Sequence, residues 1–344
     1  MSAKPLDSLP PTETLEIENG LSLVPRVRLN LTVYSSTGVV TKPVDEWKMK
    51  RTLIDFLKNS LSVPITVPED DLQIRRLRDL KKRKRDDPVA FGILVIRDLG
   101  FLKKGGKRSD VEEEEDAKEL ERKFLEWRKY IVEKMDGIEL NIEGVKYKLN
   151  VVVPDSDDFE GTKKAWEEFY AFGNRGFSRG KQEPDTIIVR GVPSRWFAEP
   201  RVSSSKFSVL VTHTIFSTFG KIRNLNVAED DGLGKDANED GDDLISGLHC
   251  KIVVQFETYQ DFYNAFKVLC GRSLQKQEGS KLRADYEVTW DKDGFFRFSR
   301  NQPEQNSSRI RELTTTHQRS EAPRYQQRVS QFSADQAPRK RFKE

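Results

Sequence analysis

The sequence predicts an α+β protein built from two units, each running strand–helix–strand–strand–helix–strand. A partly helical linker is expected between them, and both ends of the chain are expected to be disordered. Short segments of alternating or continuous apolar residues, typical of strands, recur between longer segments whose apolar residues fall at helical spacing. The 344 residues also exceed what one ordinary core requires, so two domains are expected.

The first unit is expected over residues 21–154, after a polar, proline-containing arm at residues 1–20. Its opening strand, RVRLNLTVY, alternates apolar and polar residues, and Asp45 stands where it can cap the helix that follows. The predicted strands of this unit are 26–34, 63–68, 90–99 and 146–154, and its predicted helices are 46–60 and 117–135.

The linker is expected at residues 155–183, with one short helix, and the second unit at residues 184–291. An acidic loop at 229–243 interrupts that unit, and a basic tail at 292–344 is too poor in aliphatic residues to fold alone. The predicted strands of the second unit are 186–192, 221–229, 249–257 and 281–290, and its predicted helices are 203–219 and 258–271.

This order of elements predicts a four-stranded antiparallel sheet backed by two helices, the ferredoxin-like arrangement, in each unit. At this length the RNA-recognition motif is the commonest module with that arrangement, and it stacks bases on aromatic residues of its two central strands. Here the stacking positions are Ile188, Lys251 and Val253, and none is aromatic. The first unit also lacks an aromatic pair on its central strand, although Phe91 supplies one ring. Both units are therefore expected to be diverged members of that fold.

Two phrases in the second unit, PDTI-x-x-x-G-x-P-x-x-WFA and FG-x-IRN, resemble the A-kinase anchor protein 17A family. The matching residues are Pro184 to Ile187, Gly191, Pro193, Trp196 to Ala198, and Phe219 to Asn224. The resemblance implies a splicing-factor-like protein of nuclear speckles that contains an RNA-recognition motif. The animal members continue into long charged segments that carry kinase anchoring, whereas this chain ends at Glu344 after a short tail. The implied partners are RNA and splicing factors, and the protein kinase A regulatory subunit is a partner only under the kinase-anchoring alternative given below.

Several side chains of the second unit are candidates for RNA contact. Arg190, Lys251 and Gln255 should share one sheet face, where they could contact RNA or could form a solvated or covered polar face. The segment that matches the family adds Lys221, Arg223 and Asn224. Trp196 could stack on a base or could anchor its loop in the core.

A basic run between two strands of the first unit is a further candidate. It could contact nucleic acid, act as a nuclear import signal, or form a solvated basic helix. The residues of this run are Arg75, Arg76, Arg78, Lys81, Lys82, Arg83, Lys84 and Arg85.

No catalytic constellation, metal-spaced cysteine or histidine set, or dinucleotide fingerprint is found in the sequence, so neither an enzyme nor a cofactor is expected. Lys and Arg number 59 against 56 for Asp and Glu, so the net charge is only +3. The places where charged residues cluster therefore indicate more about binding partners than the net charge does. We therefore expect a nuclear RNA-binding protein of pre-mRNA splicing. The alternative is a protein–protein adaptor or kinase-anchoring scaffold with little direct RNA binding.

Overall fold

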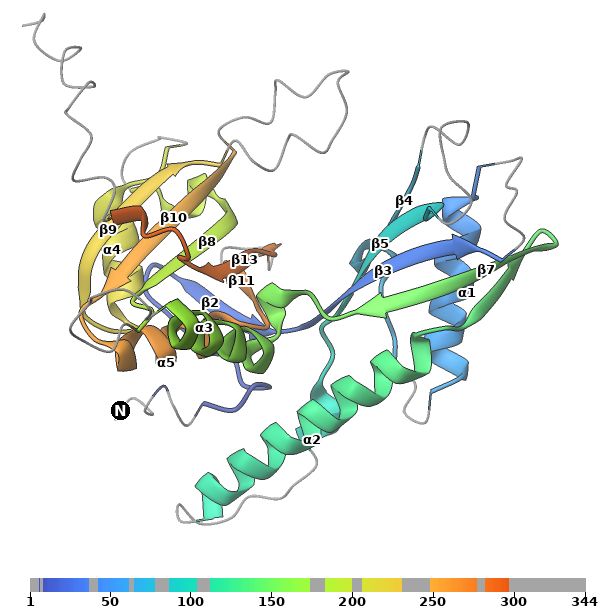
Figure 1. Ribbon diagram of the computed structural model, residues 1–344, viewed down its shortest axis with the longest axis horizontal. Helices are drawn as coiled ribbons and strands as arrows, with labels where there is room; N and C mark the ends of the chain where they lie inside the picture. The colour runs from blue at the N-terminus through green and yellow to red at the C-terminus, as the bar shows by residue number, and fades with distance from the viewer. Residues whose placement is uncertain are drawn as a thin grey trace, which may run out of the picture. The chain divides into compact units, whose positions relative to one another are not determined.

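The computed structural model shows a mixed α/β protein with antiparallel sheets (Figure 1). It describes residues 6, 9–36, 43–61, 65–77, 87–103, 112–173, 183–199, 206–230, 248–276 and 282–296. Among the described residues, no helix is long and apolar enough to cross a membrane.

The first large sheet has five strands in the order β4-β5-β3-β7-β6, and every neighbouring pair is antiparallel. Its strands are β3 (Val27–Ser35), β4 (Leu72–Arg76), β5 (Ala90–Ile96), β6 (Glu139–Ile142) and β7 (Val145–Val152). The helices of this part of the chain are α1 (Glu46–Asn59) and α2 (Glu112–Met135). The predicted cap is confirmed, because the Asp45 carboxylate accepts hydrogen bonds from the backbone N–H groups of Trp47 and Lys48.

Strand β3 shows how the sequence builds this sheet. Val27, Leu29, Leu31 and Val33 are buried, whereas the residues between them are partly or fully exposed. The alternation puts one face of the sheet into the core and leaves the other without helices. The apolar face of α2 joins the same core, since Phe124 and Ile131 are buried there. That face is therefore not free to serve as an anchoring helix for another protein.

Two details of this sheet differ from the expectation. The predicted strand at 63–68 is not formed at its described residues, 65–68; the second strand is β4, and its last two residues, Arg75 and Arg76, open the basic run. Pro64 and Pro68 explain the difference, since each removes a backbone donor that a sheet requires. The extra strand β6 pairs with β7 as a hairpin whose turn places Gly144 at φ +83°.

The second large sheet has the strand order β13-β8-β10-β9. Its strands are β8 (Thr186–Pro193), β9 (Ile222–Glu229), β10 (His249–Phe256) and β13 (Glu287–Trp290). Its helices are α4 (Val209–Ser217) and α5 (Tyr259–Leu269). Gly191, in the G-x-P phrase, has φ +79°, and its N–H donates to Asp230 at 3.1 Å, so the end of β8 requires glycine.

A third, smaller sheet joins the start of the chain to its C-terminal half, in the order β1-β2-β11-β12. Its strands are β1 (Leu15–Glu16), β2 (Leu21–Pro25), β11 (Arg272–Lys276) and β12 (Leu282–Ala284). The expected disordered arm is thus wrong for residues 9–20, where Leu9 and Thr12 are buried. The expected strand 281–290 is divided between two sheets.

The expected linker also contributes to the second core. Helix α3 (Phe159–Gly173) buries Trp166, whose ring meets the rings of Phe262 and Phe266 edge-on at 5.3 Å each. These aromatic contacts fix α3 against α5, so this segment is part of the packed structure and not a free connection.

Candidate nucleic-acid interface

The face of the second sheet that is turned away from α4 and α5 is the predicted RNA-binding face. Strand β10 directs Ile252, Val254 and Phe256 into the core, so Lys251, Val253 and Gln255 point to the opposite side. The predicted sharing of one face by Lys251 and Gln255 therefore follows from the strand geometry. However, Val253 is only 1% exposed and Gln255 is 9% exposed, so the centre of this face is not open to solvent.

The segment after β13 supplies an aromatic ring to this face. The Asp291 carboxylate accepts hydrogen bonds from the N–H groups of Asp293, Gly294 and Phe295 at 3.1, 3.1 and 2.6 Å. This turn directs Phe295 toward β10, where the Lys251 ammonium lies 5.6 Å from the ring centroid. The ammonium of Lys251 therefore already has a cation–π partner within the chain.

Gln255 and Asn224 take part in hydrogen bonds within the sheet. The Gln255 amide nitrogen donates to Asp185 at 2.8 Å, and its oxygen accepts from the Asn224 amide at 2.6 Å. This chain of polar groups crosses from the start of β8 over β10 to β9. These hydrogen bonds hold the three strands together, and contact of these two side chains with RNA stays a prediction.

Trp196 is also a structural residue. It is 8% exposed and lies in the second core beside Phe197, whose ring stacks on that of Phe216 at 6.5 Å. Its backbone carbonyl accepts a hydrogen bond from the Asn19 amide at 3.2 Å. Of the two roles considered, this burial favours anchoring of the loop.

Three predicted cations remain exposed around the second sheet, namely Arg190 on β8, Lys221 before β9, and Arg223 on β9. Arg190 lines a groove of about 220 Å³ in which Arg28 pairs with Glu287 and Arg97 pairs with Asp71 and Asp285. Arg190 forms no ion pair with any residue that the structure describes, so its guanidinium is available to an anionic ligand.

The basic run is only partly described. Arg75 and Arg76 are exposed on β4, where Arg76 approaches Glu46 at 3.8 Å and its N–H donates to the same carboxylate. The other members of the run, Arg78, Lys81, Lys82, Arg83, Lys84 and Arg85, lie outside the described residues.

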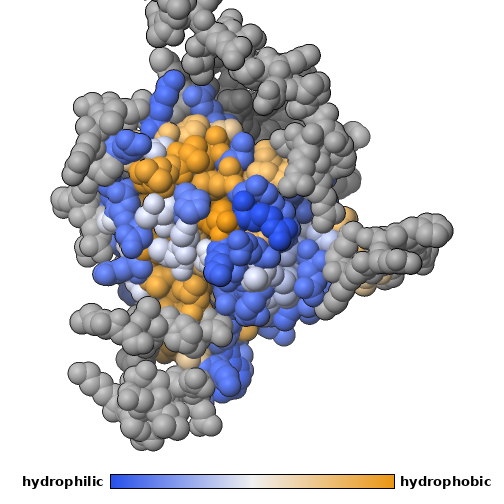
Figure 2. All heavy atoms as spheres, turned by 90° about the vertical axis from the view of Figure 1, so that its left-hand side faces the viewer, coloured by the Kyte–Doolittle hydropathy of each residue, from blue (hydrophilic) through white to orange (hydrophobic). Residues whose placement is uncertain are grey.

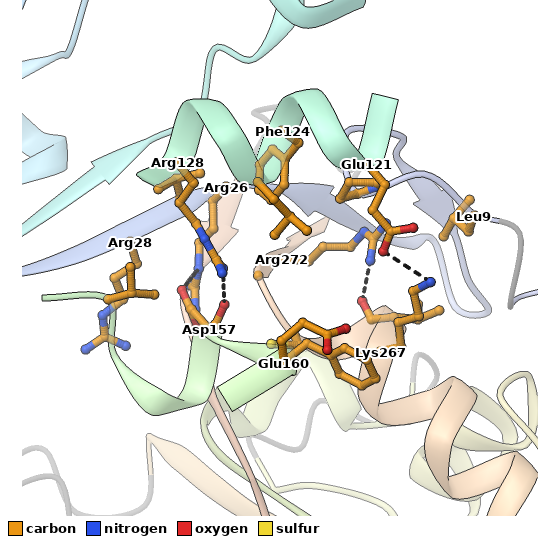
Figure 3. A pocket seen from close by; sticks show the side chains of 18 residues that line it. Leu9, Arg26, Arg28, Glu121, Phe124, Arg128, Asp157, Glu160, Lys267 and Arg272 are labelled. Carbon is orange, nitrogen blue, oxygen red and sulfur yellow. Dashed lines mark hydrogen bonds and ion pairs between the residues drawn. The ribbon is translucent and has the colours of Figure 1, made fainter. Parts of the chain in front are cut away.

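A cavity of about 70 Å³ lies between α2, α5 and the turn before α3 (Figure 3). The guanidinium of Arg26 is buried there and pairs with Asp157 at 3.2 Å and with Asp285 at 2.7 Å. Arg272, also buried, donates to the carbonyls of Val268 and Pro10 at 2.7 and 2.8 Å. Groups within the chain therefore bind both guanidinium groups. These interactions hold distant segments together around the cavity, which is not an RNA-binding surface.

A family model described as the AKAP-17A-like RNA-binding domain matches residues 118–331. The chain belongs to this family. The human A-kinase anchor protein 17A (Homo sapiens) is 25% identical over 163 residues, which is 46% of this chain but only 24% of the human protein.

The extent of the family match is informative about the fold. The AKAP-17A-like domain begins within α2 and includes β7, α3 and the whole second sheet, so it crosses the predicted boundary at residue 184. Strands β3, β4 and β5 lie before the matched residues. The resemblance seen in the sequence at Pro184–Asn224 is confirmed, since those residues fall inside the match.

Proposed function

We propose that this protein binds single-stranded RNA and acts in pre-mRNA splicing in the nucleus. The observation that carries the proposal is the AKAP-17A-like RNA-binding domain match over a sheet bordered by three exposed cations. The strand order β13-β8-β10-β9 with two helices is the one that an RNA-recognition motif has, and the first sheet contains the same core order β4-β5-β3-β7. We therefore assign both parts of the chain to a diverged form of this ferredoxin-like fold.

The affinity should come mainly from phosphate contacts. The stacking positions of the second sheet lack aromatic residues, and Phe295 is in contact with Lys251. Each phosphate contact on a single strand contributes about 0.7 to the slope of log affinity against log salt. Contacts from Arg190, Lys221 and Arg223 should together contribute about 2 to that slope.

The test is a fluorescence-anisotropy titration of the full chain with a labelled, mixed-sequence single-stranded RNA of about 20 nucleotides at several salt concentrations. The full chain is used because residues 9–25 are part of the second core and the small sheet. Changing Arg190, Lys221 and Arg223 to Ala should weaken binding at low salt and reduce the salt slope by about 2. Absence of RNA binding by the unchanged chain at low salt would exclude the proposal.

A matched control removes the same charge elsewhere. Arg122, Lys123 and Lys129 are exposed on α2, so changing these three to Ala lowers the net charge equally without altering the second sheet. The proposal requires that this control keep most of the salt slope. An equal loss in both triple variants would assign binding to overall charge and not to these three positions.

A second candidate function, a protein–protein adaptor in splicing complexes, is favoured by α4. Val209 and Leu210 are 55% and 70% exposed, and the nine-residue helix contains no charged residue. Figure 2, which views this side of the molecule, shows apolar side chains gathered at the surface. Exposed apolar groups of this kind are typical of interaction sites.

The adaptor is tested by affinity purification from nuclear extract after ribonuclease treatment, with the unchanged chain and a Leu210→Asp variant. Partners that survive the nuclease and are lost in the variant would support the adaptor. Partners that the nuclease removes would support the RNA-binding function. Nuclear location is tested separately by a fluorescent fusion in which the basic residues from 75 to 85 are changed to Gln, which should move the protein to the cytoplasm.

A further inference from the structure

Helices α3 and α5 enclose a groove that is lined mainly by aromatic side chains. Figure 1 shows the two helices side by side, and the groove has a volume of about 610 Å³, which is typical of ligand-binding sites. The rings that line it are those of Trp166 and Tyr170 on α3 and of Tyr259 and Tyr263 on α5. The centroids of the Tyr259 and Tyr263 rings are 6.1 Å apart and their planes meet at 52°, so these two rings form an open angle and do not stack.

The most deeply buried of these rings brings a polar donor to the groove. Trp166 is 1% exposed, and its indole N–H forms no hydrogen bond of ordinary geometry within the described residues. The hydroxyl of Tyr259 is a polar group near it. Buried donors in native structures are nearly always paired, so a carbonyl oxygen that displaces this hydroxyl would complete the bonding of the N–H. A peptide backbone supplies such an oxygen at every residue, proline included.

The groove also attracts cations. The ammonium of Lys163 lies 5.5 Å from the ring centroid of Tyr263, and the nearby Tyr263 raises the pKa of that ammonium. Tyr259 stands one turn earlier on α5, and no cation of the described residues lies over its ring. The face of Tyr259 is therefore open to a cation that comes from another molecule.

Two carboxylates set the charge preference of the groove. Burial is the main cause that raises the pKa of the Tyr259 hydroxyl, and the negative charges of Glu167 and Glu183, which also line the groove, raise it further. Glu167 is exposed and forms no ion pair with any residue that the structure describes. These carboxylates repel phosphate, so they disfavour RNA. A guanidinium would find a carboxylate and an aromatic face side by side.

We propose that this groove binds a proline-rich segment of a partner protein that contains arginine and adopts the polyproline II conformation. Aromatic-lined grooves recognise such segments because the conformation is formed before binding and costs little ordering entropy. The prolines pack between the rings of Tyr259 and Tyr263, and an arginine lies over Tyr259 and pairs with Glu167. The inference goes beyond the proposed RNA binding and does not rest on it, and no residue of α4 lines this groove.

The test measures binding of labelled synthetic peptides to the full chain by fluorescence anisotropy at low salt. The probe has three Pro-Pro-Arg units, and the three-residue turn of polyproline II places all of its arginines on one edge. A peptide of three Pro-Pro-Gln units keeps the conformation without the charge. A peptide of three Gly-Ser-Arg units keeps the charge without the conformation, and so measures attraction to carboxylates elsewhere, such as the acidic segment 229–243. The probe should bind several-fold more tightly than either control peptide.

Substitutions in the groove locate the binding. Glu167→Gln should weaken binding of the probe roughly 2- to 5-fold and lessen its salt dependence, as expected for one exposed ion pair. The matched control is Glu168→Gln, because Glu168 is the next residue on α3, is exposed, and does not line the groove. Tyr259→Leu should weaken binding roughly 2- to 30-fold through loss of one cation–π contact, whereas Tyr259→Phe keeps the ring and should retain most of the affinity. Thermal unfolding midpoints establish that the variants fold equally.

The outcomes distinguish the occupants of the groove. No binding of the probe by the unchanged chain would overturn the inference, whatever the chain does with RNA. Equal binding of the Gly-Ser-Arg peptide, or equal losses in Glu167→Gln and Glu168→Gln, would assign the binding to general charge and also overturn it. If sedimentation shows a dimer of the unchanged chain and a monomer of Tyr259→Leu, the occupant is a second copy of this chain and the inference is wrong.

Discussion

Replacement of Arg26 by Met should destabilise the protein strongly, because Arg26 is a deeply buried cation that connects the start of the chain with its C-terminal half. Its side chain is 1% exposed, and it pairs with Asp157, whose side chain is 5% exposed, and with Asp285. It also donates to the Tyr286 carbonyl at 2.8 Å. Asp285 retains Arg97 as a partner after the change, so the unpaired buried charge is that of Asp157.

The size of the effect follows from that unpaired carboxylate. Breaking a buried pair from one side costs about 3–5 kcal/mol, because the remaining charge has lost both water and its partner. For a chain of this size, that should lower the midpoint of thermal unfolding by roughly 6–20 °C. Urea denaturation followed by far-ultraviolet circular dichroism gives the free energy of unfolding for each variant.

The double variant Arg26→Met with Asp157→Asn provides the decisive comparison. Removal of the second charge should recover about 2 kcal/mol relative to Arg26→Met alone, since a neutral amide is less costly to bury than a carboxylate. Arg122→Met is the control, because its partners on α2 are exposed and the loss should stay below about 0.5 kcal/mol. If the double variant is no more stable than Arg26→Met, the charge argument is wrong.

Three further predictions concern the packing of Asp285, Trp166 and Gly220. Burial raises the pKa of Asp285, but Arg26 and Arg97 lower this pKa well below the ordinary carboxyl value. The ionised Asp285 carboxylate therefore stabilises the fold at pH values above the unfolded-state pKa of about 3.9. This stabilisation is lost as the pH falls below that value. Asp285→Asn should therefore cost roughly 2 kcal/mol in urea at pH 7 and progressively less below pH 4, and a loss independent of pH would contradict this. Trp166→Ala should cost about 3–5 kcal/mol, and a loss below about 1 kcal/mol would mean that α3 does not depend on this ring. Gly220→Ala should cost about 1–3 kcal/mol in the same assay, because an added Cβ would lie 2.5 Å from the Cβ of Asp261, and a neutral result would show that α5 can move aside.

Most elements that depend on a local sequence pattern could be predicted from the sequence. The alternation in RVRLNLTVY defined β3 within one residue, and Asp45 marked the start of α1. The side-chain alternation along β10 also placed Lys251 and Gln255 on one face. These features depend on neighbours within a few residues, and a single sequence contains that information.

What the sequence could not predict depends on contacts between distant segments. Nothing in the short apolar segment LSLVP indicates that it pairs with β11. The hydrogen bonds of Gln255 could not be foreseen either, because its partners Asp185 and Asn224 lie 70 and 31 residues away in the sequence. A usable signal was present in one case, since the two prolines of VPITVP argue against a strand there.

The pairing of β2 with β11 has a consequence for how the protein is made. Leu21 faces Lys276, so the N-terminal strand must wait until some 250 further residues have left the ribosome before its partner exists. At roughly 5–20 residues per second, that delay is on the order of 10–50 s. During this interval the exposed edge of β2 and the apolar side chains beside it are open to other chains, so a newly made molecule depends on chaperones for longer than its size alone would suggest.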